Sequence, residues 1–213
     1  MKTRDRILHT SRTLFNEEGE AHQTAVDIAG ALEISPGNLY YHFKGKDAII
    51  HALFDEFEEE MMIILRGSRG VISSIQDSWV YTYIILEEIY DFRFFYRNLG
   101  ALLARYPDLA RRFGVLLAEK RATINALLND LQSTNLVSIT PGMSEILEEQ
   151  MLMTATFWLS KDQIEGQNLA SKHLIHRTVY QMMTLIVPYM GEAGFGTLNA
   201  LTAYYQTAIK EAE

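Results

Sequence analysis

The 213-residue sequence predicts an all-α protein with a short N-terminal three-helix domain and a larger C-terminal helical bundle. Apolar residues recur at the 3.6-residue spacing of amphipathic helices, and no stretch has the strict alternation of a half-buried strand. The clearest break is the GSRG stretch at 67–70, because glycine and serine interrupt helices. We therefore expect an N-terminal domain at 1–46, a connecting helix at 47–66 and a C-terminal domain at 67–213.

Composition excludes several classes of protein. Hydrophobic residues make up 48% of the chain, enough for a sizeable core. Cysteine is absent, which excludes disulfides and thiol chemistry. No apolar run approaches the roughly 18 residues of a membrane span, and the N-terminus lacks the apolar region of a signal peptide. We expect a cytoplasmic protein that makes no membrane contact.

The first helix is expected from about Thr3 to Glu17. Its apolar stripe leaves the basic side chains on other faces. These side chains either contact DNA phosphates or form an ordinary solvated face. The candidates for phosphate contacts are Lys2, Arg4 and Arg6.

Two short helices joined by a tight turn are predicted between Thr24 and Phe43. Thr24 is placed to cap the first helix, and Asp27 three residues later completes a reciprocal pair. Ser35 followed by Pro36 suits the start of the second helix, where the missing N–H of proline costs nothing. This arrangement is a helix-turn-helix, whose second helix enters the DNA major groove.

The outer face of the second short helix carries groups suited to DNA. Gly37 allows a close backbone approach, and Asn38 can pair with adenine. Tyrosine and histidine can donate to phosphate oxygens, and Lys46 opens the connecting helix near a phosphate position. With the basic residues of the first helix, the predicted DNA-binding residues are Thr24, Ser35, Gly37, Asn38, Tyr40, Tyr41, His42 and Lys46.

This stretch resembles the DNA-binding domain of the TetR family of bacterial one-component repressors. The residues that carry the resemblance are Thr24, Ile28-Ala29, Ser35-Pro36-Gly37, Leu39 to Phe43, and Lys46. Residues 92–113 are also similar to the C-terminal domain of a subgroup of these repressors. The resemblance implies a homodimer that binds a palindromic operator in double-stranded DNA and is released by a small-molecule ligand. Val26 departs from the pattern, because several relatives carry a basic or polar residue there.

The net charge of −8 is unusual for a DNA-binding protein, and almost all of it lies after residue 50. An acidic C-terminal part would repel DNA and confine binding to the basic N-terminal end. The acidic balance and Val26 leave an alternative open, a helical small-molecule or protein-binding module without DNA-binding activity.

The rest of the chain is predicted to be helical. The connecting helix should extend from Lys46 to Arg66 along an apolar stripe. Polar or glycine-rich segments at 132–141, 160–168 and 191–196 separate the later helices. Those helices are expected at Val71–Asp91, Phe94–Arg105, Pro107–Asp130, Met143–Leu159, Leu169–Met190 and Thr197–Lys210.

Aromatic and methionine side chains are dense in the C-terminal part. Such residues line pockets for apolar or amphipathic small molecules, although they also simply fill helical cores. The residues that we expect to line an effector pocket are Trp79, Tyr83, Tyr90, Phe94, Phe95, Met151, Phe157 and Trp158.

Two C-terminal helices are apolar on more than one face, which indicates two packing partners or complete burial. In the first helix, Leu147, Met151, Thr154 and Trp158 form one stripe, and Ile146, Met153 and Phe157 form another. A second copy related by a two-fold axis could cover one face and would place two reading helices about 34 Å apart. The predicted dimer residues are Leu147, Met151, Thr154, Ile175, Val179, Met182, Met183 and Ile186.

Motifs of enzymes are lacking. The sequence has no phosphate-binding loop, nucleophile elbow or HExxH motif. His173 and His176 could share a metal at i, i+3, but no acidic partner is placed beside them, so surface histidines are favoured. We expect no catalytic residue, metal or cofactor.

Overall fold

The computed structural model describes residues 2–67, 74–166 and 170–212. Every regular element within these ranges is a helix, so the predicted all-α class is confirmed. The N-terminal helices are α1 (Thr3–Glu18), η1 (Glu20–His22), α2 (Ala25–Ala31), α3 (Pro36–His42) and α4 (Lys46–Gly67). They are followed by α5 (Ile75–Asp91), α6 (Arg93–Arg97), α7 (Leu99–Arg105), α8 (Pro107–Ser133), α9 (Pro141–Glu165), α10 (Ser171–Thr184), η2 (Val187–Tyr189) and α11 (Ala193–Ala212).

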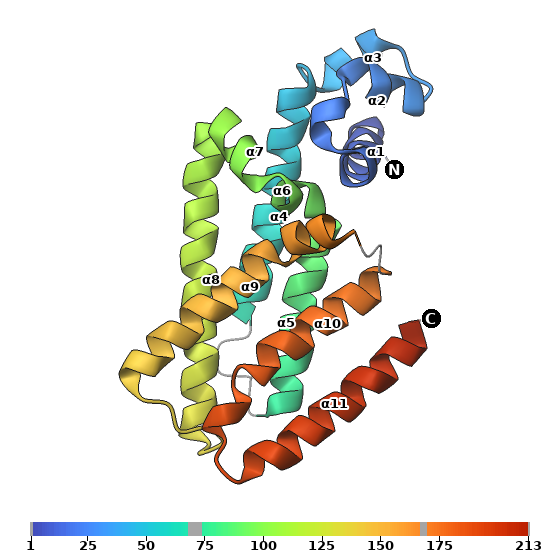
Figure 1. The fold of residues 1–213 in the computed structure, drawn as a ribbon. Coiled ribbons are helices and arrows are strands. Elements are labelled where there is room, and N and C mark those ends of the chain that lie inside the picture. Colours follow the sequence, from blue (N-terminus) through green and yellow to red (C-terminus); the bar gives the residue numbers. More distant parts are fainter. Residues whose placement is uncertain (1, 68–73, 167–169, 213) are drawn as a thin grey trace.

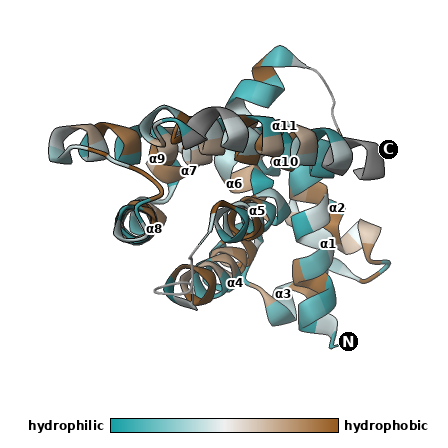
Figure 2. Cartoon of the chain, turned by 90° about the horizontal axis from the view of Figure 1, so that it is seen from below, coloured by the Kyte–Doolittle hydropathy of each residue, from teal (hydrophilic) through white to brown (hydrophobic). Residues whose placement is uncertain are grey.

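The helices form a small head and a larger body, joined by α4. The head is α1 to α3, which cluster around the start of α4 at one end of the molecule (Figure 1). The body is α5 to α11. Viewed along the molecule, α9, α10 and α11 form one layer over α4 and α5, while α8 and the head lie on opposite sides (Figure 2). α4 therefore reaches from the head deep into the body.

Most predicted helix boundaries agree with the structure, and the differences have local causes. The helix predicted at Phe94–Arg105 is divided into α6 and α7 at Asn98. α9 continues through the predicted loop to Glu165 and ends at Gly166, whose φ of 62° is the left-handed conformation that closes many helices. α10 ends at Thr184, and a short 3₁₀ turn containing Pro188 follows, because proline cannot continue an α-helix.

Some expectations fall partly outside the described residues. Gly67 ends α4, but the rest of the predicted GSRG boundary and the expected start of the next helix at Val71 lie in the undescribed range 68–73. The end of the predicted loop and Leu169 lie in the undescribed range 167–169. Among the described helices, none is long and apolar enough to cross a membrane.

An aromatic cluster in the core joins α4 to the body. Phe57 on α4 is fully buried, and its ring centroid lies 5.4 Å from that of Phe92 and 5.9 Å from that of Tyr96. Phe54 packs edge-on against Phe95 at 5.4 Å. Burial of several large rings at one place stabilises the contact through area and through edge-to-face geometry. The position of α4 in the body is therefore fixed along its middle.

We predict that Phe57→Ala lowers the free energy of unfolding by about 3–5 kcal/mol, because the truncation leaves a cavity among rings that cannot close around it. Urea denaturation at a fixed protein concentration measures the change. Ile63→Ala on the same helix is the control, since Ile63 is 66% exposed and its truncation should change stability by at most about 0.5 kcal/mol. Equal losses in the two variants would contradict the assigned core.

Candidate nucleic-acid interface

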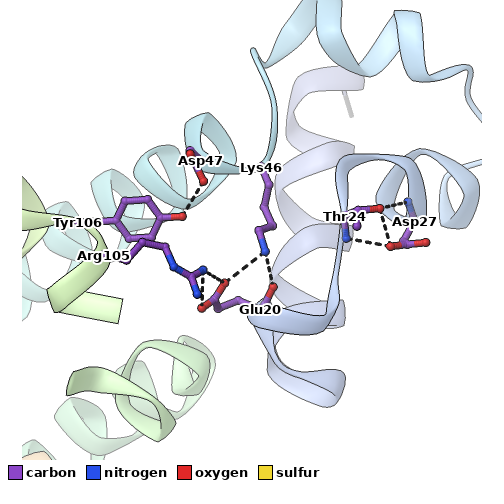
Figure 3. Close-up of polar contacts among 7 residues, drawn as sticks. All are labelled: Glu20, Thr24, Asp27, Lys46, Asp47, Arg105 and Tyr106. Carbon is purple, nitrogen blue, oxygen red and sulfur yellow. Dashed lines mark hydrogen bonds and ion pairs between the residues drawn. The ribbon is translucent and has the colours of Figure 1, made fainter. Parts of the chain in front are cut away.

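The predicted cap of α2 is confirmed. The Thr24 hydroxyl accepts from the backbone N–H of Asp27 at 3.2 Å, and the backbone N–H of Thr24 donates to the Asp27 carboxylate at 2.8 Å (Figure 3). The hydroxyl also donates to the same carboxylate at 2.6 Å, and these hydrogen bonds lower the pKa of Asp27. The Thr24 hydroxyl is thus engaged in capping, and a phosphate contact would have to share it.

A tight turn sets the angle between α2 and α3. Glu33 has a φ of 56°, a conformation that costs a residue with a Cβ atom about 1 kcal/mol. The backbone N–H of Ile34 donates to the carbonyl of Ala29 at 3.0 Å, and the Ile34 side chain packs against the core. The tight turn predicted between the two short helices is therefore present, and Ile34 is directed inward.

α3 is anchored on one face and open on the other. Ser35 accepts from the backbone N–H of Asn38 at 3.2 Å and caps the helix, while Leu39 is fully buried below it. The opposite face presents exposed side chains, and Tyr41 keeps 81% of its surface exposed. The remaining predicted residues of this face are Gly37, Asn38 and Tyr40, all exposed, and His42, which is half-buried with its ring beside that of Tyr41.

The predicted basic residues of α1 lie at the surface of the same head. Lys2, Arg4 and Arg6 are exposed. The guanidinium of Arg4 lies 5.1 Å from the ring centroid of Phe43, which follows α3. This cation–π contact holds Arg4 close to the end of the candidate reading helix.

Lys46 opens α4 as predicted, and its side chain points into the chain. Its ammonium donates to the backbone carbonyl of Glu20 at 2.8 Å and lies 3.5 Å from the Glu20 carboxylate (Figure 3). The side chain is only 19% exposed, because it is drawn inward to a carboxylate that is 2% exposed. The side chain is thus committed within the chain, and only the backbone N–H groups at the start of α4 remain for a phosphate.

Glu20 also ties the head to the body. Arg105 at the end of α7 donates to its carboxylate at 3.1 Å (Figure 3). Beside this pair, the Tyr106 hydroxyl donates to Asp47 on α4 at 2.6 Å. Burial and this hydrogen bond raise the pKa of Tyr106 to about 12, so the phenol stays protonated. One buried carboxylate therefore holds cations from α4 and α7 together.

Asn16 makes a second link between head and body. Its side-chain amide donates to the carbonyl of Asp91 at 2.8 Å and accepts from the backbone N–H of Phe94 at 3.1 Å. Arg97 donates to the backbone carbonyl of Asn16 at 3.0 Å. Sequence patterns give no sign of Asn16 or Glu20, because neither residue belongs to a motif and both pair with residues far along the chain.

Within the described part of the chain, the residues predicted to line one effector pocket lie in different places. Trp79 lies in a groove of about 200 Å³ between α5 and α11, and Phe157 lies in a groove of about 580 Å³ along α7, α8 and α9. Phe94 and Phe95 belong to the core near the head, Tyr83 packs on His176, and Tyr90 on Trp158. Most of these residues are packing residues, since aromatic density does not show which helices face one another.

A separate small cavity lies inside the body. It has a volume of about 30 Å³ and is lined by side chains of α4, α5, α8, α9 and α10. Of the predicted pocket residues, Met151 alone lines it. We call it the core cavity. Its lining includes Leu65 at the end of α4 and one charged residue, Lys120.

The predicted dimer residues lie mostly inside the single chain. Seven of them are at most 4% exposed within a single chain, and Thr154 is half-buried. They have almost no surface left for a second copy. The other stripe of α9 is the open one, with Ile146 54%, Met153 49% and Phe157 51% exposed. The periodicity indicates two apolar faces but does not reveal which one the chain itself covers.

Comparison with known proteins places these features in a family. The model described as "Bacterial regulatory proteins, tetR family" matches residues 7–53, and the model described as "Bacterial transcriptional repressor" matches residues 56–197. The chain is 28% identical over 173 residues to the transcriptional regulator UidR of Escherichia coli (strain K12), covering 79% of this chain and 84% of that protein.

Solved structures of similar regulators have the same fold as this chain. A TetR-family regulator from Marinobacter aquaeolei VT8 superimposes with a TM-score of 0.85 and 29% identity over 98% of this chain and 99% of that one. GusR from Salmonella enterica superimposes with a TM-score of 0.57 and 25% identity over 86% of this chain and 95% of that one.

A double-mutant cycle tests the interaction of Glu20 with Lys46. We predict that Glu20→Gln and Lys46→Met are coupled by about 1–3 kcal/mol in the free energy of unfolding, since each change alone removes one member of an ion pair at a buried carboxylate. The same cycle on Lys161 and Glu165, an exposed pair at 2.6 Å on α9, should give a smaller coupling because water screens it. Additive effects of the Glu20 and Lys46 changes would show that the buried pair does not hold the head.

Proposed function

The chain belongs to the TetR family of bacterial transcriptional regulators, and on that basis we propose a dimeric repressor released from a palindromic operator by a small-molecule ligand. Membership gives sequence-specific DNA binding and transcriptional regulation rather than enzymatic catalysis. The single observation that carries the proposal is the open face of α3. It presents Asn38, Tyr40 and Tyr41 to solvent from a capped helix whose other face is buried.

In the proposed complex, α3 lies in the major groove and reads bases with Asn38. Tyr41 and the exposed Arg6 reach phosphates at the rim and set the register. The backbone at the start of α4 supplies a further phosphate contact, since the positive end of a long helix attracts anions. Lys46 contributes by holding this helix start against Glu20.

We propose that a second copy of the chain covers the open stripe of α9. Ile146, Met153 and Phe157 are exposed apolar residues on one helix face, and the groove of about 580 Å³ beside them is lined mainly by apolar residues of α7, α8 and α9. Arg121 and Glu149 stand within the same groove and form an ion pair at 2.6 Å. A patch with both signs of charge is self-complementary across a two-fold axis.

The proposed switch acts through α4. Two hydrogen bonds hold its far end beside the core cavity, from Tyr81 to the carbonyl of Ile64 at 3.1 Å and from Thr123 to that of Leu65 at 3.4 Å. A ligand that enlarges the cavity would move this end of the helix. Because α4 also carries the start of the head, such movement changes the spacing of the two reading helices. A coupling of about 1–3 kcal/mol lowers operator affinity about 5- to 150-fold.

Base and phosphate contacts are tested with DNA from the region upstream of the gene and with unrelated DNA, each at two salt concentrations. We predict that Asn38→Ala weakens binding to the selected sequence by about 5-fold or more. Arg6→Ala should weaken binding to all sequences and reduce the salt dependence, because a phosphate contact releases a counterion. Asn199→Ala, at an exposed position of α11, is the matched control.

Binding by Asn38→Ala that equals the wild type would contradict the assigned reading helix. If neither the upstream DNA nor a genome-wide fragment selection gave selective binding, the repressor proposal would give way to a helical binding module.

The dimer is tested by sedimentation velocity on Met153→Glu and Phe157→Glu. Each change places a charge in the proposed apolar contact and should raise the dimer dissociation constant by about 30-fold or more. Ile63→Glu, at an exposed apolar residue of α4, should leave the dimer intact. If both α9 variants form dimers as well as the wild type does, the interface lies on another surface of the chain.

A further inference from the structure

Lys120 is the one charged residue in the buried face of α8. Most of its neighbours on that face are apolar, with Phe113, Leu116 and Leu127 almost fully buried, and Lys120 itself is 3% exposed. A methionine or leucine side chain would fill this place without a charge. Lysine is rarely buried without a partner, because removing an ammonium from water carries a large penalty.

The described partners of this ammonium are all uncharged. Lys120 donates to the Tyr96 hydroxyl at 2.5 Å, and the rings of Tyr96 and Phe113 lie 4.8 and 5.9 Å from Nζ. Tyr96 is fully buried, and burial raises the pKa of its phenol, so Tyr96 does not provide a negative charge. Within the described part of the chain, no carboxylate forms an ion pair with Lys120.

Nearby acidic residues do not supply the missing charge. Burial and the neighbouring Glu60 raise the pKa of Glu88 on α5, which favours the neutral form of this carboxyl. Burial likewise lowers the pKa of Lys120 to about 7, as expected for an ammonium that lacks a counter-ion.

Lys120 lines the core cavity, and its ammonium lies at the Tyr96 hydroxyl, which is not part of the lining. The other polar side chains of the lining are Tyr81, Thr82 and Thr123, and the rest of the lining is apolar. One cation with a few hydroxyl groups at an apolar site is the arrangement that orients a mainly apolar ligand by a single polar end.

We propose that the effector is a mainly apolar molecule with one carboxylate, which pairs with Lys120 in the core cavity. This inference rests on the proposed function, since it takes the core cavity as the effector site. The Tyr96 hydroxyl, which now accepts from Lys120, has a proton that it can donate to the same carboxylate. An ion pair with additional hydrogen bonds is what makes a buried charge favourable.

The size of the cavity gives the proposed ligand a mechanical effect. A volume of about 30 Å³ holds little more than one water molecule. An acid with an apolar chain therefore has to push the walls apart, and Leu65 at the end of α4 is one of those walls. Binding of the acid and displacement of α4 are then the same event.

The experiment uses the full chain without DNA. The probes are straight-chain acids from butanoate to decanoate and 3-phenylpropanoate, each beside its primary amide. Calorimetric titration gives affinity, and thermal unfolding gives stability. We expect at least one acid to bind and its amide to bind much more weakly. Lys120→Met should lower the affinity for the acid by about 30-fold or more, because it removes one member of a buried charge pair.

Lys161→Met, at an exposed lysine of α9, is the control and should bind the acid normally. A second readout needs no ligand. If Lys120 serves binding, Lys120→Met in the free protein should unfold at the same or a higher temperature, because an unpaired buried charge is gone. A lower unfolding temperature would show a structural role and overturn the proposal.

Three further results would overturn the proposal. They are equal affinities for an acid and its amide, equal affinities of Lys120→Met and the wild type for the acid, and no binding of any acid. DNA binding is measured separately. If an acid binds through Lys120 while the chain fails to select DNA, the inference stands and the repressor proposal falls.

Discussion

The buried carboxylate of Glu20 is the interaction on which the arrangement of head and body depends. It is 2% exposed and holds Lys46 from α4 and Arg105 from α7. A carboxylate removed from water is stable only while its cations stay in place. The head can therefore not swing freely on α4, and its direction is set by the helices of the body. Asn16 reinforces this constraint with hydrogen bonds to the junction of α5 and α6.

This constraint is the basis of the proposed link between a change inside the body and DNA binding. α4 begins at Lys46 beside Glu20 and runs to the wall of the core cavity at Leu65. Phe57 and its ring neighbours fix the middle of the helix. A displacement at the cavity end is therefore expected to tilt the helix about its packed middle and to move the head end. In a dimer, two such tilts add, and the spacing of two α3 helices decides whether both fit one palindrome.

The parts of the molecule that the sequence predicts well are those with local causes. Thr24, Ser35 and Pro36 act on residues within one turn, so the caps and the helix-turn-helix follow from spacing alone. The face of α9 that stays open and the lining of the core cavity depend on which helices pack together, and periodicity does not contain that information. Glu20 shows the limit most clearly, because a glutamate after a glycine looks like a surface residue until Arg105, 85 positions later, is placed beside it.

The most direct test measures the distance between the two heads of the proposed dimer. The chain has no cysteine, so Lys44→Cys, at an exposed position between α3 and α4, can carry the only spin label. If Glu20 fixes the head, the wild-type background should give one narrow distribution of label distances, and Glu20→Gln should broaden it. A broad distribution in the wild-type background, or an unchanged one after Glu20→Gln, would contradict a head held by the body.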